Sequence, residues 1–279
     1  MLLVAYDGSS FHGFAAQPGQ RTVAGELGSR LASMAGHEVA LTCAGRTDTG
    51  VHALAQVVHV DLDEAVLEKW AKRDLVPGMV LERLASSLTT QLAPSVAVIE
   101  ARVAPEGFDA RHSATARRYR YKLLRTPWPD PLCDVSSWHV PGELDLAAMR
   151  IGADALLGEH DFSSFCRLAK GESPPVTRRV LSASWAPDPG DARIWLFEIE
   201  ANAFCHQMVR SVVGTLVAMG EGRIRAGEML AILESGDRSL SWQPAPPRGL
   251  CLMGVRYPED LVPEGVWEPG LGDWPVGHS

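Results

Sequence analysis

Residues 39–60 read VALTCAGRTDTGVHALAQVVHV, and the structure expected for the rest of the chain is arranged around this stretch. Its apolar ends, Val39–Cys43 and Ala55–Val60, have the composition of β-strands, so the residues between them form a loop that joins two strands. Gly45 and Gly50 bracket the loop and allow a sharp turn. The stretch therefore predicts two strands with a glycine-bounded loop between them.

The loop contains an arginine and a carboxylate two residues apart, Arg46 and Asp48, followed by His52. A turn of this kind can direct all three side chains toward one cleft. The alternative is an ordinary hairpin turn in which Asp48 accepts hydrogen bonds from backbone N–H groups, because aspartate and glycine are common in turns. The spacing alone leaves both interpretations open.

The composition is that of a globular protein. The chain has 279 residues, 46% of them hydrophobic, and can bury one large core or two smaller ones. A formal net charge of −8 argues by itself against a polyanionic partner. However, Arg111–Arg125 contains six basic residues and no acidic one, and a nucleic-acid-binding protein needs only one basic face. A solvated strand face would have the same composition.

The N-terminus shows no signal-peptide pattern, and no apolar run approaches the roughly 18 residues of a membrane span. We therefore expect a cytoplasmic protein without a membrane segment. The five cysteines are far apart and include no C-x-x-C pair, so we expect reduced, mostly buried thiols and no zinc site. They are Cys43, Cys133, Cys166, Cys205 and Cys251.

The first half of the chain is expected to have the order β-α-β-β-α-β. Thr22 can cap a helix that runs through Met34 with its apolar residues on one face. The expected strands are Leu2–Tyr6, Val39–Cys43, Ala55–Asp61 and Val96–Val103, and further helices are expected over Glu64–Arg73 and Val80–Leu92.

The second half repeats this order. Strands are expected over Tyr119–Leu124, Val180–Trp185, Ile194–Ala201 and Leu250–Tyr257. Helices are expected from the cap Asp145 through Leu157, over Cys205–Met219 and over Ala226–Glu234. Residues 158–178 are interpreted as a long polar loop, and the tail after Pro258 as irregular.

This order predicts an α+β fold of two ferredoxin-like (β-α-β-β-α-β) halves that form a continuous mixed or antiparallel sheet around a central catalytic cleft. Pro105-Glu106-Gly107 interrupts the periodicity between them. We therefore place the domain boundary so that residues 1–107 carry the Asp48 loop and residues 108–279 form the second half.

The segment Gly45-Arg46-Thr47-Asp48-Thr49-Gly50-Val51-His52-Ala53 resembles the catalytic loop of the tRNA pseudouridine synthase A (TruA) family, and Gln56-Val57-Val58-His59 follows it as in the family. Six further segments resemble family signatures and follow the family's order along the chain. They are Tyr6-Asp7-Gly8, Phe108-Asp109-Ala110-Arg111, residues 113–121, residues 160–165, Phe204 with Met208-Val209-Arg210 and Gly214, and Gly249-Leu250.

The resemblance implies an isomerase that converts uridine to pseudouridine, with Asp48 as the nucleophile. Whether Asp48 attacks the ribose C1′ or the base C6 stays open. Either route needs an ionised carboxylate; burial would raise its pKa, and a cation within about 4–6 Å would counteract this. Arg46 suits that task because a planar guanidinium can pair with a carboxylate and remains charged.

The resemblance also assigns catalytic roles to Tyr119 and Arg210. Tyr119 offers a ring for the uracil face and a phenol near the transferred proton. The alternative interpretation is that Tyr119 is an ordinary aromatic residue of a strand. Arg210 could pair with Asp48 or bind phosphate. The alternative interpretation is that Arg210 is an ordinary arginine on a helix surface. The substrate-binding residues implied are Arg111, Arg117, Arg118, Leu250 and Phe204. For His52 and His206 we expect neither a metal-binding nor an acid–base role.

The implied substrate is the anticodon arm of tRNA, with uridines 38 to 40 as targets, recognised through shape and phosphates. The resemblance further implies a homodimer, and no cofactor is expected because the reaction includes neither a redox step nor hydrolysis.

Two other functions remain open. The chain departs from the family pattern at Phe14, Ala15 and Thr89, which favours a catalytically weak tRNA-binding or tRNA-folding relative as the second hypothesis. A third is a Mg²⁺-dependent hydrolase that uses Asp7 and Asp48.

Overall fold

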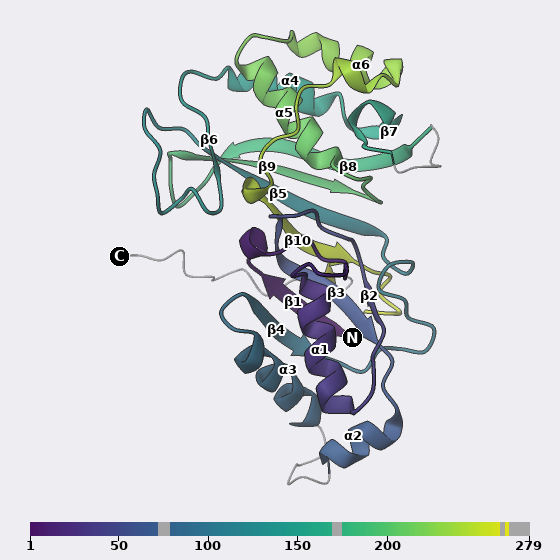
Figure 1. The fold of residues 1–279 in the computed structure, drawn as a ribbon. Coiled ribbons are helices and arrows are strands. Elements are labelled where there is room, and N and C mark those ends of the chain that lie inside the picture. Colours follow the sequence, from purple (N-terminus) through teal and green to yellow (C-terminus); the bar gives the residue numbers. More distant parts are fainter. Residues whose placement is uncertain (72–78, 169–174, 263–265, 268–279) are drawn as a thin grey trace. The chain divides into compact units, whose positions relative to one another are not determined.

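The computed structural model describes residues 1–71, 79–168, 175–262 and 266–267 (Figure 1). It contains two compact units, which are described separately below. Unit 1 comprises Met1–Thr115 and the described residues from Leu252 onward, and unit 2 comprises Ala116–Cys251. The expected domain division between residues 107 and 108 stays a prediction.

Unit 1 is built on antiparallel strands covered by helices. Strand β1 pairs with β3 on one side and with β4 on the other, and β2 pairs with the end of β3. Helix α3 contacts both β4 and α1. The strands are β1 (Leu2–Tyr6), β2 (Leu41–Cys43), β3 (His52–Val60) and β4 (Val96–Ala101), and the helices are α1 (Val23–Ala35), α2 (Glu64–Ala71) and α3 (Met79–Leu92).

Helix α1 illustrates how the local sequence determines these elements. The Thr22 side chain accepts a hydrogen bond from the Gly25 N–H group at 3.1 Å and caps the first turn. The helix ends at Gly36, whose positive φ of 87° suits a residue without a side chain. The apolar face of α1 is fully buried through Val23, Leu27 and Leu31.

Unit 2 has antiparallel strands in the order β5-β9-β8-β7, and β6 pairs with β5 in parallel. Its strands are β5 (Ala116–Leu124), β6 (Trp138–His139), β7 (Gly158–Asp161), β8 (Thr177–Pro187) and β9 (Ile194–Ala201). Its helices are α4 (Leu146–Asp154), α5 (Met208–Gly220) and α6 (Met229–Ser235). Strand β10 (Leu250–Arg256) begins in unit 2 and continues in unit 1, where it pairs with β11 (Val266–Trp267).

The predicted α+β class with a mixed sheet is confirmed, and several boundaries are corrected. Residues 158–161, expected in a loop, form strand β7. The sequence pattern does not indicate this strand, because its residues are polar and show no apolar alternation. Helix α5 begins at Met208 instead of Cys205, and α4 ends at Asp154 instead of Leu157. The tail, expected to be irregular, contains β11. The part of the expected helix Glu64–Arg73 beyond residue 71 lies outside the described residues.

The expectation of five reduced thiols is wrong for two of them. Cys166 and Cys205 form a disulfide with a Cα–Cα distance of 5.7 Å, whereas Cys43, Cys133 and Cys251 are free. The two partners are 39 positions apart, and only the fold brings the segment after the 3₁₀ helix Ser163–Phe165 next to the segment before α5. No local spacing could have indicated this pair.

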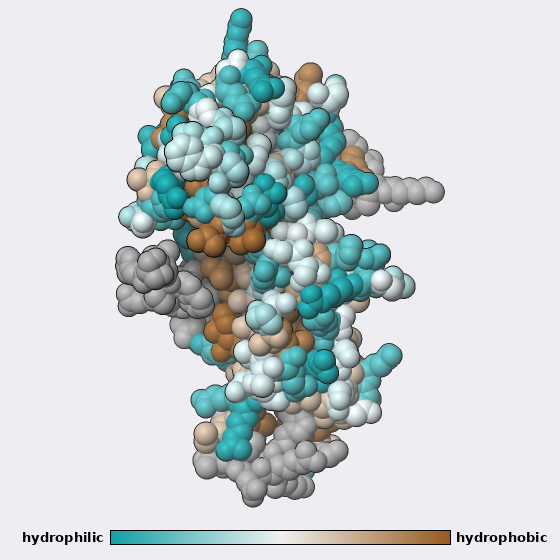
Figure 2. Space-filling model, turned by 60° about the vertical axis from the view of Figure 1, so that its left-hand side comes forward, coloured by the Kyte–Doolittle hydropathy of each residue, from teal (hydrophilic) through white to brown (hydrophobic). Residues whose placement is uncertain are grey.

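The surface is largely hydrophilic on the face shown in Figure 2, with smaller apolar areas between polar ones, as is usual for a folded chain. In the described part of the chain, none of the helices combines the length and the hydrophobicity that a bilayer span requires.

Replacing Thr22 by Ala should lower the free energy of unfolding by about 1 kcal/mol, because the buried cap of α1 loses its acceptor. Urea unfolding followed by circular dichroism measures this. Thr22→Ser is the matched control, since a serine hydroxyl retains the cap. Equal stability of Thr22→Ala and the parent chain would contradict the assignment.

Candidate active site

The Asp48 loop connects β2 to β3 and packs tightly against residues 8–14. The Phe14 N–H group donates to the Thr47 carbonyl at 3.1 Å. A Cβ atom at Gly8 would lie 2.0 Å from the Val51 carbonyl oxygen, so only glycine permits this approach. The backbone on both sides of Asp48 is therefore held by neighbouring chain.

A buried polar network fixes the residues that flank Arg46 and Asp48. The Tyr6 hydroxyl and the Thr47 hydroxyl lie 2.7 Å apart in a hydrogen bond. Gln56 is fully buried on β3; its amide donates to the Gly45 carbonyl at 2.6 Å and accepts from the Gly45 N–H group at 3.4 Å. With Gly45 and Thr47 held inward, Arg46 is exposed and Asp48 half-buried.

This network was not anticipated from the sequence, although a signal for it exists. Gln56 follows Ala55 and precedes Val57 within a strand whose neighbouring residues are buried. A polar side chain at such a position needs hydrogen-bond partners inside the protein. Tyr6, Thr47 and Gln56 thus act as positioning residues for the loop.

Asp7 and His52 contact each other at the edge of the loop. The His52 Nδ1 atom lies 3.1 Å from the Asp7 carboxylate and 3.2 Å from the Gly8 backbone nitrogen. Partial burial favours a higher pKa for Asp7, but hydrogen bonds from Ser9 and the nearby His52 outweigh it and lower the pKa below its usual value. Asp7 is thus committed to local contacts. Across the described ranges, no group of three or more His, Cys, Asp or Glu side chains is arranged to hold a metal ion.

Arg46 and Arg111 both act on the thiol of Cys43, the last residue of β2. Burial raises the pKa of this thiol to about 11, and the positive charges of Arg46 and Arg111 oppose the increase. Both guanidinium groups therefore contribute positive potential near the base of the Asp48 loop.

Arg111 is exposed on a turn that is anchored inside unit 1. The Asp109 carboxylate accepts hydrogen bonds from the N–H groups of Arg111 and His112 at 2.8 and 2.7 Å, and these bonds lower the pKa of Asp109. The Tyr257 hydroxyl donates to the Ala110 carbonyl at 2.7 Å. The turn holds the Arg111 backbone in place while its side chain faces solvent.

Tyr119 lies in unit 2 on β5 and is buried, with 7% of its surface exposed. The half-buried ring of Phe204 packs edge to face against it, with 5.0 Å between ring centroids and an interplanar angle of 84°. The structure therefore brings together two of the residues proposed from the sequence, and Phe204 restricts the orientation of the Tyr119 ring.

Arg210 and Leu250 also occupy defined positions in unit 2. Arg210 Nε donates to the Ala245 carbonyl at 2.8 Å, and the Ala245 N–H group donates back to the Arg210 carbonyl at 2.9 Å. A Cβ atom at Gly214 would lie 2.0 Å from the Gln243 carbonyl oxygen. Glycine at this position of α5 therefore allows the chain around Gln243 to approach the helix. Leu250 is buried at the start of β10.

The basic run Arg111–Arg125, which includes β5, is not a uniform cationic face. Arg117 is 8% exposed and donates to the Asn202 carbonyl at 2.9 Å, whereas Arg118 is half-buried. Two other members are engaged by neighbouring side chains. Arg120 pairs with Glu198, and Arg125 lies 3.6 Å above the Trp195 ring. The alternation of the strand and its cross-strand partners thus divide the run into residues with different roles.

Comparison with known proteins gives consistent results. A family model described as tRNA pseudouridine synthase matches residues 153–258. Three proteins named tRNA pseudouridine synthase A are similar over nearly the whole chain. That of Leifsonia xyli subsp. xyli is 41% identical over 266 residues, covering 92% of this chain and 91% of its own. Those of Frankia casuarinae and a Methylobacterium species are each 43% identical over 92% of this chain, covering 88% and 97% of their own lengths.

Gln56→Leu should lower the free energy of unfolding by about 1–3 kcal/mol, because Gly45 loses two hydrogen bonds in a partly buried setting. Amide hydrogen exchange should also speed up in residues 44–51. The matched control is Gln17→Leu, since Gln17 is exposed and bonds only to the His12 carbonyl; its effect should stay within about 0.5 kcal/mol. Equal effects of the two substitutions would contradict the positioning role.

Cys43 should resist iodoacetamide in the folded protein at about pH 8, because its raised pKa leaves almost no thiolate. Its labelling rate should increase as the pH approaches the pKa of about 11. Mass spectrometry of digested protein measures the labelling, and the urea-unfolded chain serves as the reactive control. Rapid labelling of folded protein at about pH 8 would show that the thiol is not buried as described.

Proposed function

Because this chain belongs to the tRNA pseudouridine synthase A family, we propose that it isomerises uridine to pseudouridine at positions 38 to 40 of the tRNA anticodon stem-loop. The observation that carries the proposal is the Asp48 loop, in which the buried side chains of Tyr6 and Gln56 hold Thr47 and Gly45 just before a half-buried carboxylate. Such a loop can present one ionisable oxygen pair in a reproducible direction, as nucleophilic catalysis requires.

In the proposed reaction, the target uridine turns out of its stem, at a cost of about a few kcal/mol that pocket contacts offset. Asp48 bonds transiently to the nucleotide, and the C1′–N1 bond breaks. The base rotates, the C1′–C5 bond forms and the aspartate is released. The proton lost from C5 is balanced by protonation at N1, so substrate and product are isomers and no cofactor is required.

The other proposed residues supply charge and orientation. Arg46 supplies a permanent positive charge in the same loop as Asp48, and Arg210 either pairs with Asp48 or binds a phosphate. Tyr119, whose ring is restrained by Phe204, contacts uracil and lies near the transferred proton. We assign Arg111, Arg117, Arg118, Leu250 and Phe204 to substrate binding. Of these, exposed Arg111 is the best placed to contact a phosphate.

We further propose that the protein acts in the cytoplasm as a symmetric homodimer that binds the anticodon arm of tRNA. Two of the departures from the family pattern, Phe14 and Thr89, fit the fold locally. Phe14 is buried, with its ring centroid 6.1 Å from that of Tyr6. Thr89 Oγ1 donates to the Val98 carbonyl at 3.0 Å and accepts from the Val98 N–H group at 2.8 Å, which ties α3 to β4.

Asp48→Asn should abolish pseudouridine formation while leaving tRNA affinity within several-fold, because the amide is a poor nucleophile of nearly the same shape. Product is measured by tritium release from an anticodon-arm transcript whose uridines carry tritium at C5. Filter binding measures the affinity for tRNA. Asp154→Asn, an exposed carboxylate at the end of α4, is the matched control and should retain full activity.

The alternatives give different outcomes in the same assay. Product from the parent chain in the presence of a chelator contradicts the Mg²⁺-dependent hydrolase. Tight binding without product supports a tRNA-binding relative. Full activity of Asp48→Asn, or a loss of its tRNA binding, overturns the role of Asp48.

A further inference from the structure

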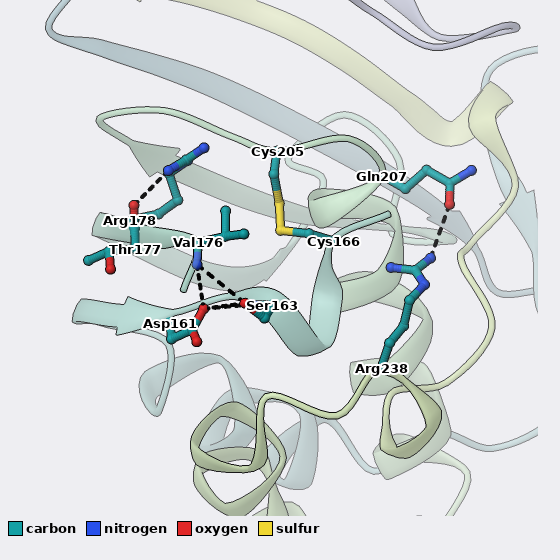
Figure 3. The surroundings of a disulfide bond; sticks show 9 residues. All are labelled: Asp161, Ser163, Cys166, Val176, Thr177, Arg178, Cys205, Gln207 and Arg238. Carbon is teal, nitrogen blue, oxygen red and sulfur yellow. Dashed lines mark hydrogen bonds between the residues drawn. A yellow bond between two sulfur atoms is a disulfide. The ribbon is translucent and has the colours of Figure 1, made fainter. Parts of the chain in front are cut away.

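The Cys166–Cys205 disulfide joins two segments of unit 2 (Figure 3). The two segments differ in burial. On one side, Phe162 through Cys166 are buried, and Ser164 Oγ donates to the Ile232 carbonyl at 2.6 Å. The Asp161 carboxylate accepts from the N–H groups of Ser163 and Val176, at 3.0 and 2.7 Å. This segment is a well-anchored part of the core.

The other segment, residues 202–207, has only exposed or half-buried side chains. It leads from β9 into α5 and contains Phe204, whose ring contacts Tyr119. The Arg167 N–H group donates to the His206 carbonyl at 2.9 Å, and this backbone hydrogen bond joins the same two segments as the disulfide. The disulfide thus ties the weakly packed segment that carries Phe204 to the anchored one.

Gln207 shows that the 202–207 segment is conformationally constrained. It is the only residue other than glycine with a positive φ, 65°, in the described part of the chain. A side chain disfavours this conformation, so neighbouring contacts must maintain it. Those contacts include the Cys205 disulfide two residues earlier and the hydrogen bond from Arg238 Nη2 to Gln207 Oε1 at 3.0 Å (Figure 3).

We propose that the Cys166–Cys205 disulfide is a covalent clamp that positions Phe204 against Tyr119. Thiol exchange opens this clamp. Cys166 and Cys205 are positioning residues, because they act through Phe204. The catalytic consequence rests on the proposed function of Tyr119. When the clamp is closed, the Phe204 and Tyr119 rings keep their edge-to-face contact; when it is open, the 202–207 segment samples other arrangements and fewer molecules have the reactive geometry.

The chemistry of release balances with a dithiol as the reductant. Cys166 is buried and Cys205 half-buried, so one thiolate of the dithiol attacks Cys205 Sγ. The S–S bond breaks, and Cys166 leaves and takes up a proton. The second thiol of the reductant then attacks the mixed disulfide and releases Cys205. Two electrons pass from the dithiol to the protein, and the reductant becomes a cyclic disulfide.

Thiol counting tests the bond itself. Full-length protein purified without reductant is unfolded in iodoacetamide and analysed by mass spectrometry. We expect three labelled cysteines, Cys43, Cys133 and Cys251, and five after treatment with dithiothreitol. Five labelled cysteines without reductant would overturn the proposal.

Activity and hydrogen exchange test the clamp. Complete reduction should lower kcat about tenfold with little change in KM for tRNA, because a displacement of about 1 Å near the reacting groups is costly. Cys205→Ser should show the lower kcat and no response to dithiol. Cys133→Ser, which alters a free thiol, should behave as the parent chain. An unchanged kcat after complete reduction would overturn the proposal.

Hydrogen exchange provides a readout that does not depend on the reaction. Reduction should speed exchange in residues 202–210 and leave residues 41–60 unchanged. If oxidised protein binds tRNA but forms no pseudouridine, the proposed function fails. The hydrogen-exchange result alone then decides whether the disulfide holds residues 202–207 in place. Equal exchange in the two redox forms would show that the disulfide does not hold this segment.

Discussion

The buried amide of Gln56 is the constraint on which the geometry of the Asp48 loop depends. A primary amide inside a β-strand lowers stability unless its donor and acceptor atoms find partners. Here one residue, Gly45, satisfies both, because its carbonyl accepts and its N–H group donates. The strand can therefore keep a polar residue in its buried part only while the loop retains its course. Loop conformation and strand stability are coupled through this pair.

The same principle applies in unit 2, with different chemical groups. Tyr119 comes from a strand, and an aromatic ring from the following segment restricts it. Arg210 comes from a helix, and its hydrogen bond through Nε to the Ala245 carbonyl fixes the plane of the guanidinium. In unit 1 the proposed nucleophile lies on a loop, and in unit 2 the proposed groups lie on a strand and a helix. In each unit, partners that are distant in the sequence hold these groups or the backbone beside them. This arrangement suits a reaction that requires orientation more than strong chemical activation.

The sequence predicted what local patterns determine. The Thr22-capped helix and the strand Ile194–Ala201 follow from caps and periodicity within a few residues, and both are confirmed. Contacts between distant segments were not predictable in this way, and the Cys166–Cys205 pair is the clearest example. The roles proposed for the site residues came from family resemblance, because no periodic pattern encodes them.

The distribution of the arginines bears on how an acidic chain could bind RNA. Several members of the basic run have internal partners: Glu198 neutralises Arg120, whereas Arg117 and Arg125 contact a carbonyl and an aromatic ring and keep their charge. The net charge of −8 acts at long range, where salt screens it over about 8 Å at physiological ionic strength. A phosphate in contact with Arg111 or Arg118 would lie well within that distance. Binding under these conditions depends on how a few cations match the phosphate positions of a folded RNA, which favours recognition of its shape.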